Sequence, residues 1–557
     1  MSGRRKGLFL APILVAILLV GSLGGGCTSN TPAPSGKPTT STSAPATGAQ
    51  QPTGELKIAM NTLQKQMMDP TLDSGSSKQQ LVPMFDYLVG IDAAGNLSKD
   101  YGIAKDWKVE HTATNSVYTF TIRQGVKFHD GTEVTANDVK FSIEYFKRPE
   151  SISSYAAALR VLIDRIEVFS QYQVVVYTKK PHAFLLTDLS ELSSPDGYVL
   201  PKDYIEKNGT DYFNKHPIGT GPYKFKENLL GTRITYEAVD YQHWLQRPKY
   251  KTVTLMLVPE ESTRIAMLKA GEADVLDSVS RSNVASLQAA GKGVFSWQGN
   301  KSLHLWLTQT WEKGTYLNDI RVREALNLSV DRQPILNNIL KGAGRISGAG
   351  PYGSWAYGYQ PVPLYDYDTA KAKALLEQAI KDNGWNRVEL TVYSYPWFGV
   401  PEAEMIVEAI AGMWTQAFGN LIKLDIVPID WVAYRQKLMD KKASNSVSFM
   451  GSPNISFWIQ QWQNVWHSKG TYYLATTPQL DALIDKAAAE PDMAKVGQEQ
   501  FDVAKYMRDN HFLVPIAEAN VVFAANPQKV TQWDLGKFQY NPNYRDIMVQ
   551  GRAYPAK

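Results

Sequence analysis

Few side chains of this sequence are spaced for catalysis. His129 and Asp130 are neighbours and could act as a base with its orienting carboxylate, but they precede Gly131 in a turn, which favours a structural role. Glycoside hydrolysis needs two carboxylates on opposite sides of a sugar ring, and proximity in sequence does not provide that arrangement. A solvated helix start explains the acidic pairs that come closest to it, Glu260 with Glu261 and Glu402 with Glu404.

The sequence also lacks the motifs of several common enzyme classes. It contains no G-x-S-x-G elbow, no H-E-x-x-H motif, no P-loop and no C-x-x-C pair. The segment Gly342-x-Gly344-x-x-Ser347 is a broken dinucleotide fingerprint and is more typical of a loop between a helix and a strand. Cysteine catalysis would have to use Cys27, the only cysteine. We therefore expect no enzyme, no catalytic residue, no cofactor and no metal site.

Tryptophan is the side chain that could instead recognise a ligand. Its ring can stack on sugar rings or on the apolar parts of a solute, although packing in the core is the alternative for each ring. Trp397 is the strongest candidate, because it follows an expected strand at a Tyr-Pro bend, where α/β sheets present ligand residues. The chain has 14 tryptophans, and its second half includes Trp306, Trp311, Trp355, Trp397, Trp458, Trp462 and Trp466.

The segment 118–139 shows how strands and helices alternate along the chain. Tyr118, Phe120 and Ile122 alternate with polar residues, which predicts a half-buried strand. Thr135 lies three residues before Asp138, in the spacing of a capping box, so a helix is expected to begin at residue 136.

Similar patterns recur in two halves of the chain, from residue 55 to about 299 and, more regularly, in the second half, and they predict an α/β fold with helices packed on sheets. We expect strands at 56–60, 174–178, 223–225, 253–258, 388–393 and 422–426, and helices at 136–146, 261–270, 372–379 and 406–417.

Segment 118–139, YTFTIRQGVKFHDGTEVTANDV, also resembles the block TFxLRxGVxFHDGxxxTAxDV of a known family. That family is the dipeptide/oligopeptide class, family 5, of bacterial extracellular solute-binding proteins, the receptors of ABC importers. Further segments resemble other blocks of the family in the same order: 85–97, 218–223, 318–332 and 366–376. The resemblance therefore covers most of the chain from about residue 54.

The resemblance implies a two-lobed fold of the periplasmic-binding-protein type, with a hinge and a ligand cleft between the lobes. Lobe I would comprise residues 54–299 with its extra subdomain, lobe II residues 300–510, and residues 511–557 would return to complete lobe I. It also implies a monomer that captures a peptide or peptide-like solute and delivers it to the permease subunits of an ABC transporter.

One segment departs from the family pattern. Peptide receptors usually carry an aspartate that pairs with the α-amino group of the ligand, whereas residues 449–458 read FMGSPNISFW. Thr308 stands where the family often has asparagine. A receptor for a non-peptide ligand, such as an oligosaccharide, an opine-like compound or a chelated metal, is therefore an alternative function, unless Asp430 or Asp481 replaces the aspartate from another loop. A secreted hydrolase or adhesin is a third possible function. The candidate ligand-binding residues are Asn61, Trp306, Thr308, Trp355, Trp397, Ser452, Asn454 and Trp458.

The N-terminal residues predict export and a lipid anchor. Three cationic residues precede the apolar stretch 8–20, which is too short to span a bilayer comfortably, as in a secretory signal. Cys27 follows and is the expected lipid attachment site, although Leu23 stands one position earlier than the lipoprotein motif requires; an unmodified thiol is the alternative. Residues 28–53 read as a flexible tether. We expect an extracytoplasmic protein held at the outer face of a membrane or in a periplasm.

The charge balance argues against nucleic acid as a partner. The formal net charge is +4, with 58 basic and 54 acidic residues, and three of the basic residues belong to the expected signal. The remaining chain is nearly neutral and shows no basic stripe, whereas nucleic-acid binding needs a basic excess.

Overall fold

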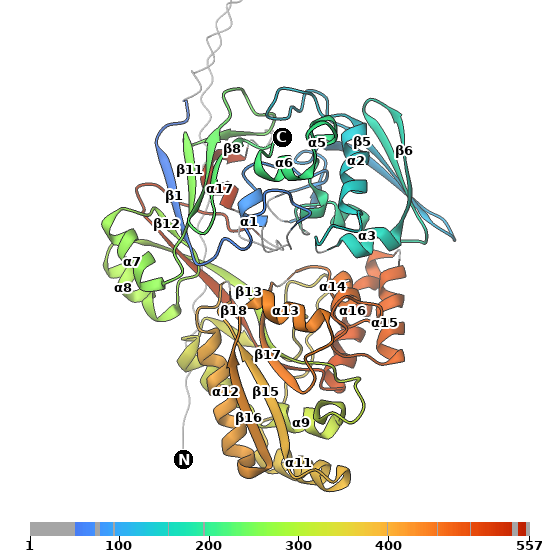
Figure 1. Ribbon diagram of the computed structural model, residues 1–557, viewed down its shortest axis with the longest axis vertical. Coiled ribbons are helices and arrows are strands. Elements are labelled where there is room, and N and C mark those ends of the chain that lie inside the picture. Colours follow the sequence, from blue (N-terminus) through green and yellow to red (C-terminus); the bar gives the residue numbers. More distant parts are fainter. Residues whose placement is uncertain are drawn as a thin grey trace, which may run out of the picture. The chain divides into compact units, whose positions relative to one another are not determined.

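The computed structural model in Figure 1 describes residues 51–72, 78–92, 95–153, 155–192, 195–397, 399–453, 455–490, 492–536 and 544–552. The chain divides into two units, Met1–Gln50 and Gln51–Lys557, and every described residue belongs to the second unit. The expected signal and tether up to residue 50, the lipidation site Cys27 and the candidate Asn454 lie outside the described residues.

The centre of the fold is an 11-stranded mixed sheet. Its middle is formed by two long antiparallel strands, β13 (Gly293–Leu307) and β18 (Leu513–Ala525). Beyond β13 lie β17 (Ser446–Pro453), β15 (Val388–Ser394) and β16 (Ile422–Pro428). Beyond β18 lie β12 (Val275–Leu276), β1 (Glu55–Met60), β11 (Thr252–Leu257), β9 (Arg233–Ala238) and β8 (Tyr223–Leu229), and β14 (Gly344–Ile346) pairs with β18 as a branch.

The two long strands contribute to two separate cores. Trp297 and Phe523 belong to a core that contains β1, β9 and β11. Leu303, Leu305 and Ile516, further along the same strands, belong to a second core that contains β15, β17 and α12 (Ala403–Phe418). We call the part around the first core lobe I and the part around the second core lobe II. In Figure 1, β13 and β18 run from the upper part of the picture into the lower part.

Lobe I carries a second, four-stranded antiparallel sheet in the order β4 (Ala104–His111), β5 (Ser116–Ile122), β7 (Gln173–Thr178) and β6 (Ile163–Ser170). Side chains of β5 alternate between buried and half-buried, as its sequence predicts. α2 (Ala136–Phe146) packs against β6 and β7. The Asp138 carboxylate accepts hydrogen bonds from the Thr135 amide (2.8 Å) and hydroxyl (2.7 Å), which confirms the predicted helix start.

The remaining helices follow the expected pattern with small differences at their ends. α7 (Glu261–Ala270) has the predicted bounds, and α11 (Thr369–Asn383) and α12 extend beyond the predicted faces. α12 lies against β15 and β16 in the lower part of Figure 1. The other α-helices are α1 (Lys78–Leu81), α3 (Ala156–Leu162), α4 (Leu185–Asp188), α5 (Lys202–Asn208), α6 (Thr210–Lys215), α8 (Val284–Ala289), α9 (Ile320–Leu328), α10 (Arg332–Pro334), α13 (Trp431–Met439), α14 (Ile459–Val465), α15 (Pro478–Ala489), α16 (Met493–Asp509) and α17 (Tyr544–Met548).

Four short strands complete the description. β2 (Gly90–Ile91) pairs with β3 (Leu97–Ser98), and β10 (Gln246–Pro248) pairs with β19 (Val549–Arg552). The pairing of β10 with β19 joins the end of the described chain to lobe I. Among the described residues, no helix has the length and apolar character needed to cross a bilayer.

Candidate functional site

The parallel strands of the two lobes give the first indication of a site. β1 runs parallel to β11 and β12 in lobe I, and β15 runs parallel to β16 and β17 in lobe II. In α/β sheets, ligands bind beyond the carboxyl ends of such strands. The candidate residues Asn61 and Ser452 lie at two of these ends, directly after β1 and near the end of β17.

Hydrogen bonds at these strand ends connect lobe I to lobe II. The backbone N–H of Asn61 donates to Oδ1 of Asp277 (2.9 Å), the residue that directly follows β12. The next residue, Ser278, accepts at Oγ a hydrogen bond from the Gly399 amide of lobe II (2.9 Å). Two residues before Gly399, the Trp397 indole N–H donates to the Gly451 carbonyl (2.7 Å). The structure therefore brings Asn61 and Trp397 to the same junction between the lobes.

A buried ion pair crosses the same junction. Arg281 of lobe I pairs with Glu402, the residue that precedes α12 in lobe II, and its amide donates to the same carboxylate (2.9 Å). The guanidinium also donates to the Asn520 carbonyl on β18. Both side chains are almost fully buried, so the ion pair itself lies out of contact with solvent.

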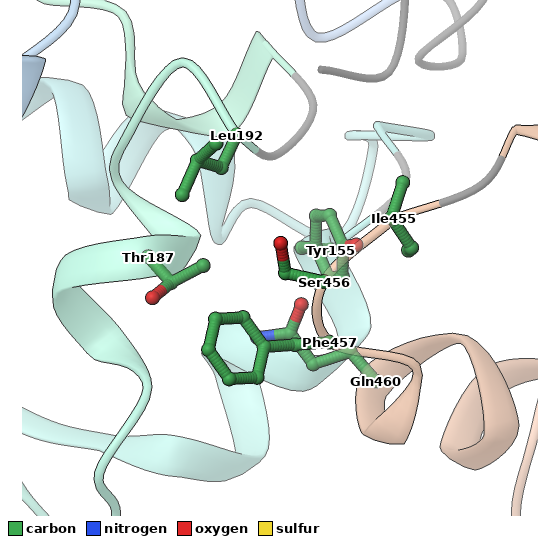
Figure 2. A pocket seen from close by; sticks show the side chains of 7 residues that line it. All are labelled: Tyr155, Thr187, Leu192, Ile455, Ser456, Phe457 and Gln460. Atoms are coloured by element: carbon green, nitrogen blue, oxygen red, sulfur yellow. The ribbon is translucent and has the colours of Figure 1, made fainter. Parts of the chain in front are cut away.

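The two lobes meet again at a small pocket that has little more room than a single water molecule. Figure 2 shows that Tyr155, Thr187 and Leu192 line it from lobe I. Ile455, Ser456 and Phe457 line it from the segment that leads into α14, and Gln460 lines it from the first turn of α14. The Phe457 ring lies 5.3 Å from Phe184 and 5.5 Å from Tyr357. The Gln460 amide donates to Asp188, whose other carboxylate oxygen lies 3.0 Å from His182 Nε2.

The face of β13 that is turned away from the lobe II core carries a row of polar side chains. Ser302, His304 and Trp306 alternate with Lys301, Leu303 and Leu305, so they share one face, and Asn300 lies directly before them, where the pairing of β13 with β18 is irregular between Trp297 and Lys301. All four are buried, and each has at least one side-chain nitrogen or oxygen atom without a hydrogen-bond partner. Buried polar groups are normally paired, so such a row calls for an explanation.

The neighbouring strands place two more polar residues beside this row. Ser302 lies opposite Ser452 on β17 and opposite Glu518 on β18. The Glu518 carboxylate pairs with Arg345 (2.7 Å) and accepts hydrogen bonds from the Ser354 amide (3.1 Å) and hydroxyl (2.5 Å). Among the candidates, Ser452 is therefore the one placed directly beside the row.

The other candidates from the sequence lie around this face. Trp306 belongs to the row, and its ring packs 6.0 Å from Trp466 in a third core. Trp458 is buried in the same core and precedes α14, which contains Trp462. Trp355 is half-buried, with its ring 5.9 Å from Trp297. The ligand-binding role of all these residues remains a prediction.

Thr308 and the two aspartates proposed as substitutes already have local partners. The Thr308 hydroxyl bonds to the Ser446 carbonyl (2.8 Å). Asp430 caps α13 by accepting from two backbone amides (2.8 and 3.1 Å). Asp481 accepts from the Ser468 amide (3.0 Å) and the Thr476 hydroxyl (2.7 Å).

The interpretation of the sequence missed three members of the row, namely Asn300, Ser302 and His304. The alternation of polar residues with leucines over 300–307 is visible in the sequence and indicates a strand with one apolar and one polar face. What the pattern alone does not reveal is that the polar face is also buried. Within the described part of the chain there is no group of three or more His, Cys, Asp or Glu side chains that could hold a metal ion.

Comparison with known proteins adds three findings. Residues 100–472 match the family model "Bacterial extracellular solute-binding proteins, family 5 Middle". The chain is 28% identical over 391 residues to the dipeptide-binding protein of Escherichia coli (strain K12). The aligned region covers 64% of this chain and 68% of that protein.

Among solved structures, the periplasmic binding protein DppA of Helicobacter pylori in complex with the peptide STSA has a TM-score of 0.75, with 23% identity, over 90% of this chain and 99% of that chain. NikZ of Campylobacter jejuni in complex with Ni(L-His) has a TM-score of 0.76, with 21% identity, over 89% and 99% of the two chains. These likenesses confirm the two-lobed fold of periplasmic binding proteins.

Proposed function

Because the chain belongs to the bacterial extracellular solute-binding proteins of family 5, we propose that it captures a peptide or peptide-like solute between its lobes and delivers it to the permease of an ABC transporter. The family consists of binding proteins and not of enzymes. The observation that carries the proposal is the junction where the carboxyl ends of the parallel strands of both lobes meet, close to Asn61 and Trp397.

The proposed division into lobes follows the cores. Lobe I would comprise residues 54–299, lobe II residues 300–510, and the segment 511–557 would return to lobe I; the first part of that segment still packs in lobe II, because Ile516, Ala517 and Ala519 belong to the second core. The two cores support this division, because Trp297 packs in the first core and Leu303 in the second. β13 and β18 would then form the hinge about which the lobes close on the solute.

The relatives leave two classes of solute open. The E. coli relative is named a dipeptide-binding protein, and the C. jejuni structure holds Ni(L-His). A non-peptide solute is favoured in this chain by one observation, which is that Gly451, Ser452 and Pro453 provide no carboxylate at the end of β17. An ammonium group placed there would lack the charged partner expected in peptide receptors.

Mass spectrometry of the solute that co-purifies with the protein tests the proposal, followed by a thermal-shift panel of candidate solutes. A ligand present at about 100 times its Kd should stabilise the fold by about 2.7 kcal/mol, since it binds only the folded state. We expect at least one peptide or small polar solute to raise the Tm. If the panel, including every co-purified compound, leaves the Tm unchanged, the proposed function is wrong.

We further propose that Cys27 carries the lipid that holds the protein at the membrane. Multiple acyl chains anchor a protein firmly, whereas one chain binds only marginally. Cys27→Ser should therefore move the protein from the membrane fraction to the soluble fraction, as measured by fractionation and immunoblotting. Ser29→Ala, two residues away, is the matched control and should remain with the membrane. A Cys27→Ser variant that stays with the membrane would refute the anchor.

A further inference from the structure

The polar row on β13 has the composition of a binding surface for uncharged groups. Asn300, Ser302 and His304 have a relative exposure of 0%, and Trp306 of 4%. The atoms without partners are both amide atoms of Asn300, Ser302 Oγ, His304 Nε2 and Trp306 Nε1. The row thus offers donors and acceptors in alternation along one strand, and none of these side chains carries a charge at neutral pH.

The protonation state of His304 follows from its surroundings. Its Nδ1 lies 3.1 Å from the Ser302 carbonyl, which can only accept, so Nδ1 carries the proton. Burial lowers the pKa of His304 to about 3, so the ring is neutral near pH 7. In a neutral imidazole with a protonated Nδ1, the other nitrogen is an acceptor. His304 Nε2 is therefore an acceptor that has no donor.

The opposite face of the same strand shows that burial alone does not explain the row. Leu303, Leu305 and Leu307 fill the core of lobe II from that face. A strand that only packs between two cores would be apolar on both faces, because a buried polar atom without a hydrogen bond lowers the stability of the fold. Glu518, the carboxylate beside Ser302, is paired with Arg345, so the row has no unbalanced charge from that neighbour.

We propose that this row is the wall of the ligand site that selects an uncharged, extended solute bearing hydroxyl or amide groups, and that it disfavours a solute with a free ammonium group. This inference rests on the proposed function and deepens it. Strands rise about 3.4 Å per residue, so the regular part of the row, from Ser302 to Trp306, spans roughly 14 Å. A solute that reaches all four side chains must have several repeating units. An oligosaccharide and a peptide with blocked ends share this chemistry.

The first test compares two serine-to-alanine variants of the full chain without any solute. Ser302→Ala removes a buried hydroxyl that has no partner, so it should leave the Tm unchanged or raise it. Ser446→Ala is the matched control, because its hydroxyl is equally buried but donates to the Ala443 carbonyl (2.8 Å) and should lower the Tm when removed. If Ser302→Ala lowers the Tm as much as Ser446→Ala, the Ser302 hydroxyl has a partner in the free protein and the inference is wrong.

The second test measures binding by isothermal titration calorimetry with three probes: cellotetraose, tetra-alanine with an acetylated N-terminus and an amidated C-terminus, and tetra-alanine with free ends. We expect one of the two uncharged probes to bind at least about tenfold more tightly than free tetra-alanine, which is the scale of one charge-assisted hydrogen bond. The uncharged probe that binds identifies the source of the hydroxyl or amide groups. Equal or tighter binding of free tetra-alanine overturns the inference while supporting the proposed function.

The variants also connect the row to binding. Ser302→Ala should weaken the bound uncharged probe about five- to tenfold, the value of one hydrogen bond, and Ser446→Ala should leave its Kd unchanged. An unchanged Kd in Ser302→Ala contradicts the inference. If none of the probes binds and no co-purified solute is found, the proposed function fails, while the comparison of the two Tm values still decides whether the Ser302 hydroxyl lacks a partner.

Discussion

Asp277 is the buried carboxylate that accepts a hydrogen bond from the backbone N–H of Asn61 at the junction between the lobes. Its side chain is fully buried, and Arg264 Nε lies 3.8 Å from it. Burial raises the pKa of Asp277 to about 7, although the Arg264 charge opposes the shift. The carboxyl group therefore changes its charge within the pH range where a solute-binding protein is usually studied.

The first prediction concerns the pH dependence caused by Asp277. A pKa of about 7 in the folded state exceeds that of an unfolded aspartate, about 3.9. The group thus contributes stability that is fully present below about pH 4 and is lost as the pH rises to about 7. Asp277→Asn keeps a side-chain oxygen that can accept from the backbone N–H of Asn61, and it removes the titrating carboxyl group. The free energy of unfolding of the wild type minus that of the variant, from urea titrations, should fall between pH 4 and pH 8; a constant difference would contradict the prediction.

Individual site residues were harder to predict from the sequence than their strands. Trp397 and Trp458 each follow a strand of the central sheet, β15 and β17, yet Trp458 is almost fully buried while Trp397 is half-buried. The sequence does not distinguish a tryptophan of the core from one at the lobe junction, because both contribute the same apolar surface. His304 was missed because its imidazole becomes informative only when its single partner, the Ser302 carbonyl, is known.

At the scale of elements, local chemistry predicted helices and strands well. β15 ends one residue beyond the expected strand, and α7 has the expected bounds. Periodicity and caps are local properties, so a single sequence reveals them. The pairing of β13 with β18 was not predicted, because it joins residues more than two hundred positions apart in the chain.

The second prediction concerns the start of α13. Asp430 accepts hydrogen bonds from the amides of Val432 and Ala433 and thereby caps the helix. Asp430→Ala should lower the free energy of unfolding by about 1 kcal/mol, and Asp430→Asn should lower it much less, because asparagine is also a good N-cap. Neither variant should change the Kd for tetra-alanine with free ends. A weaker Kd in Asp430→Asn would show instead that Asp430 is the partner of the ligand's ammonium group.

At the scale of the whole described unit, Arg281 and Glu402 join the lobes where β18 passes between them. Since the pair is buried and also bonded to the backbone, it holds the lobes at one relative angle more firmly than an exposed ion pair would. The contact between Gln460 and Asp188 is a second tie between the lobes, at the pocket of Figure 2.

The third prediction is that Glu402→Gln loosens the lobes. The variant leaves the Arg281 charge buried without its carboxylate, which typically costs about 3–5 kcal/mol. We expect a lower free energy of unfolding and a larger radius of gyration in small-angle X-ray scattering of the ligand-free protein. Glu389→Gln is the control, because its ion pair with Arg387 is exposed and should matter by less than about 1 kcal/mol. An unchanged radius in Glu402→Gln would show that the pair does not set the angle between the lobes.

The position of β18 also determines when the protein can fold during its synthesis. β18 lies between β13 and β12, so it completes the sheet of both lobes. Translation proceeds at about 5–20 residues per second, so roughly 10–40 s separate the synthesis of β13 from that of β18. Throughout this interval one edge of β13 has no strand to pair with, and such edges promote aggregation. The nascent chain therefore needs protection until its last long strand has been made, and neither lobe reaches its final stability before then.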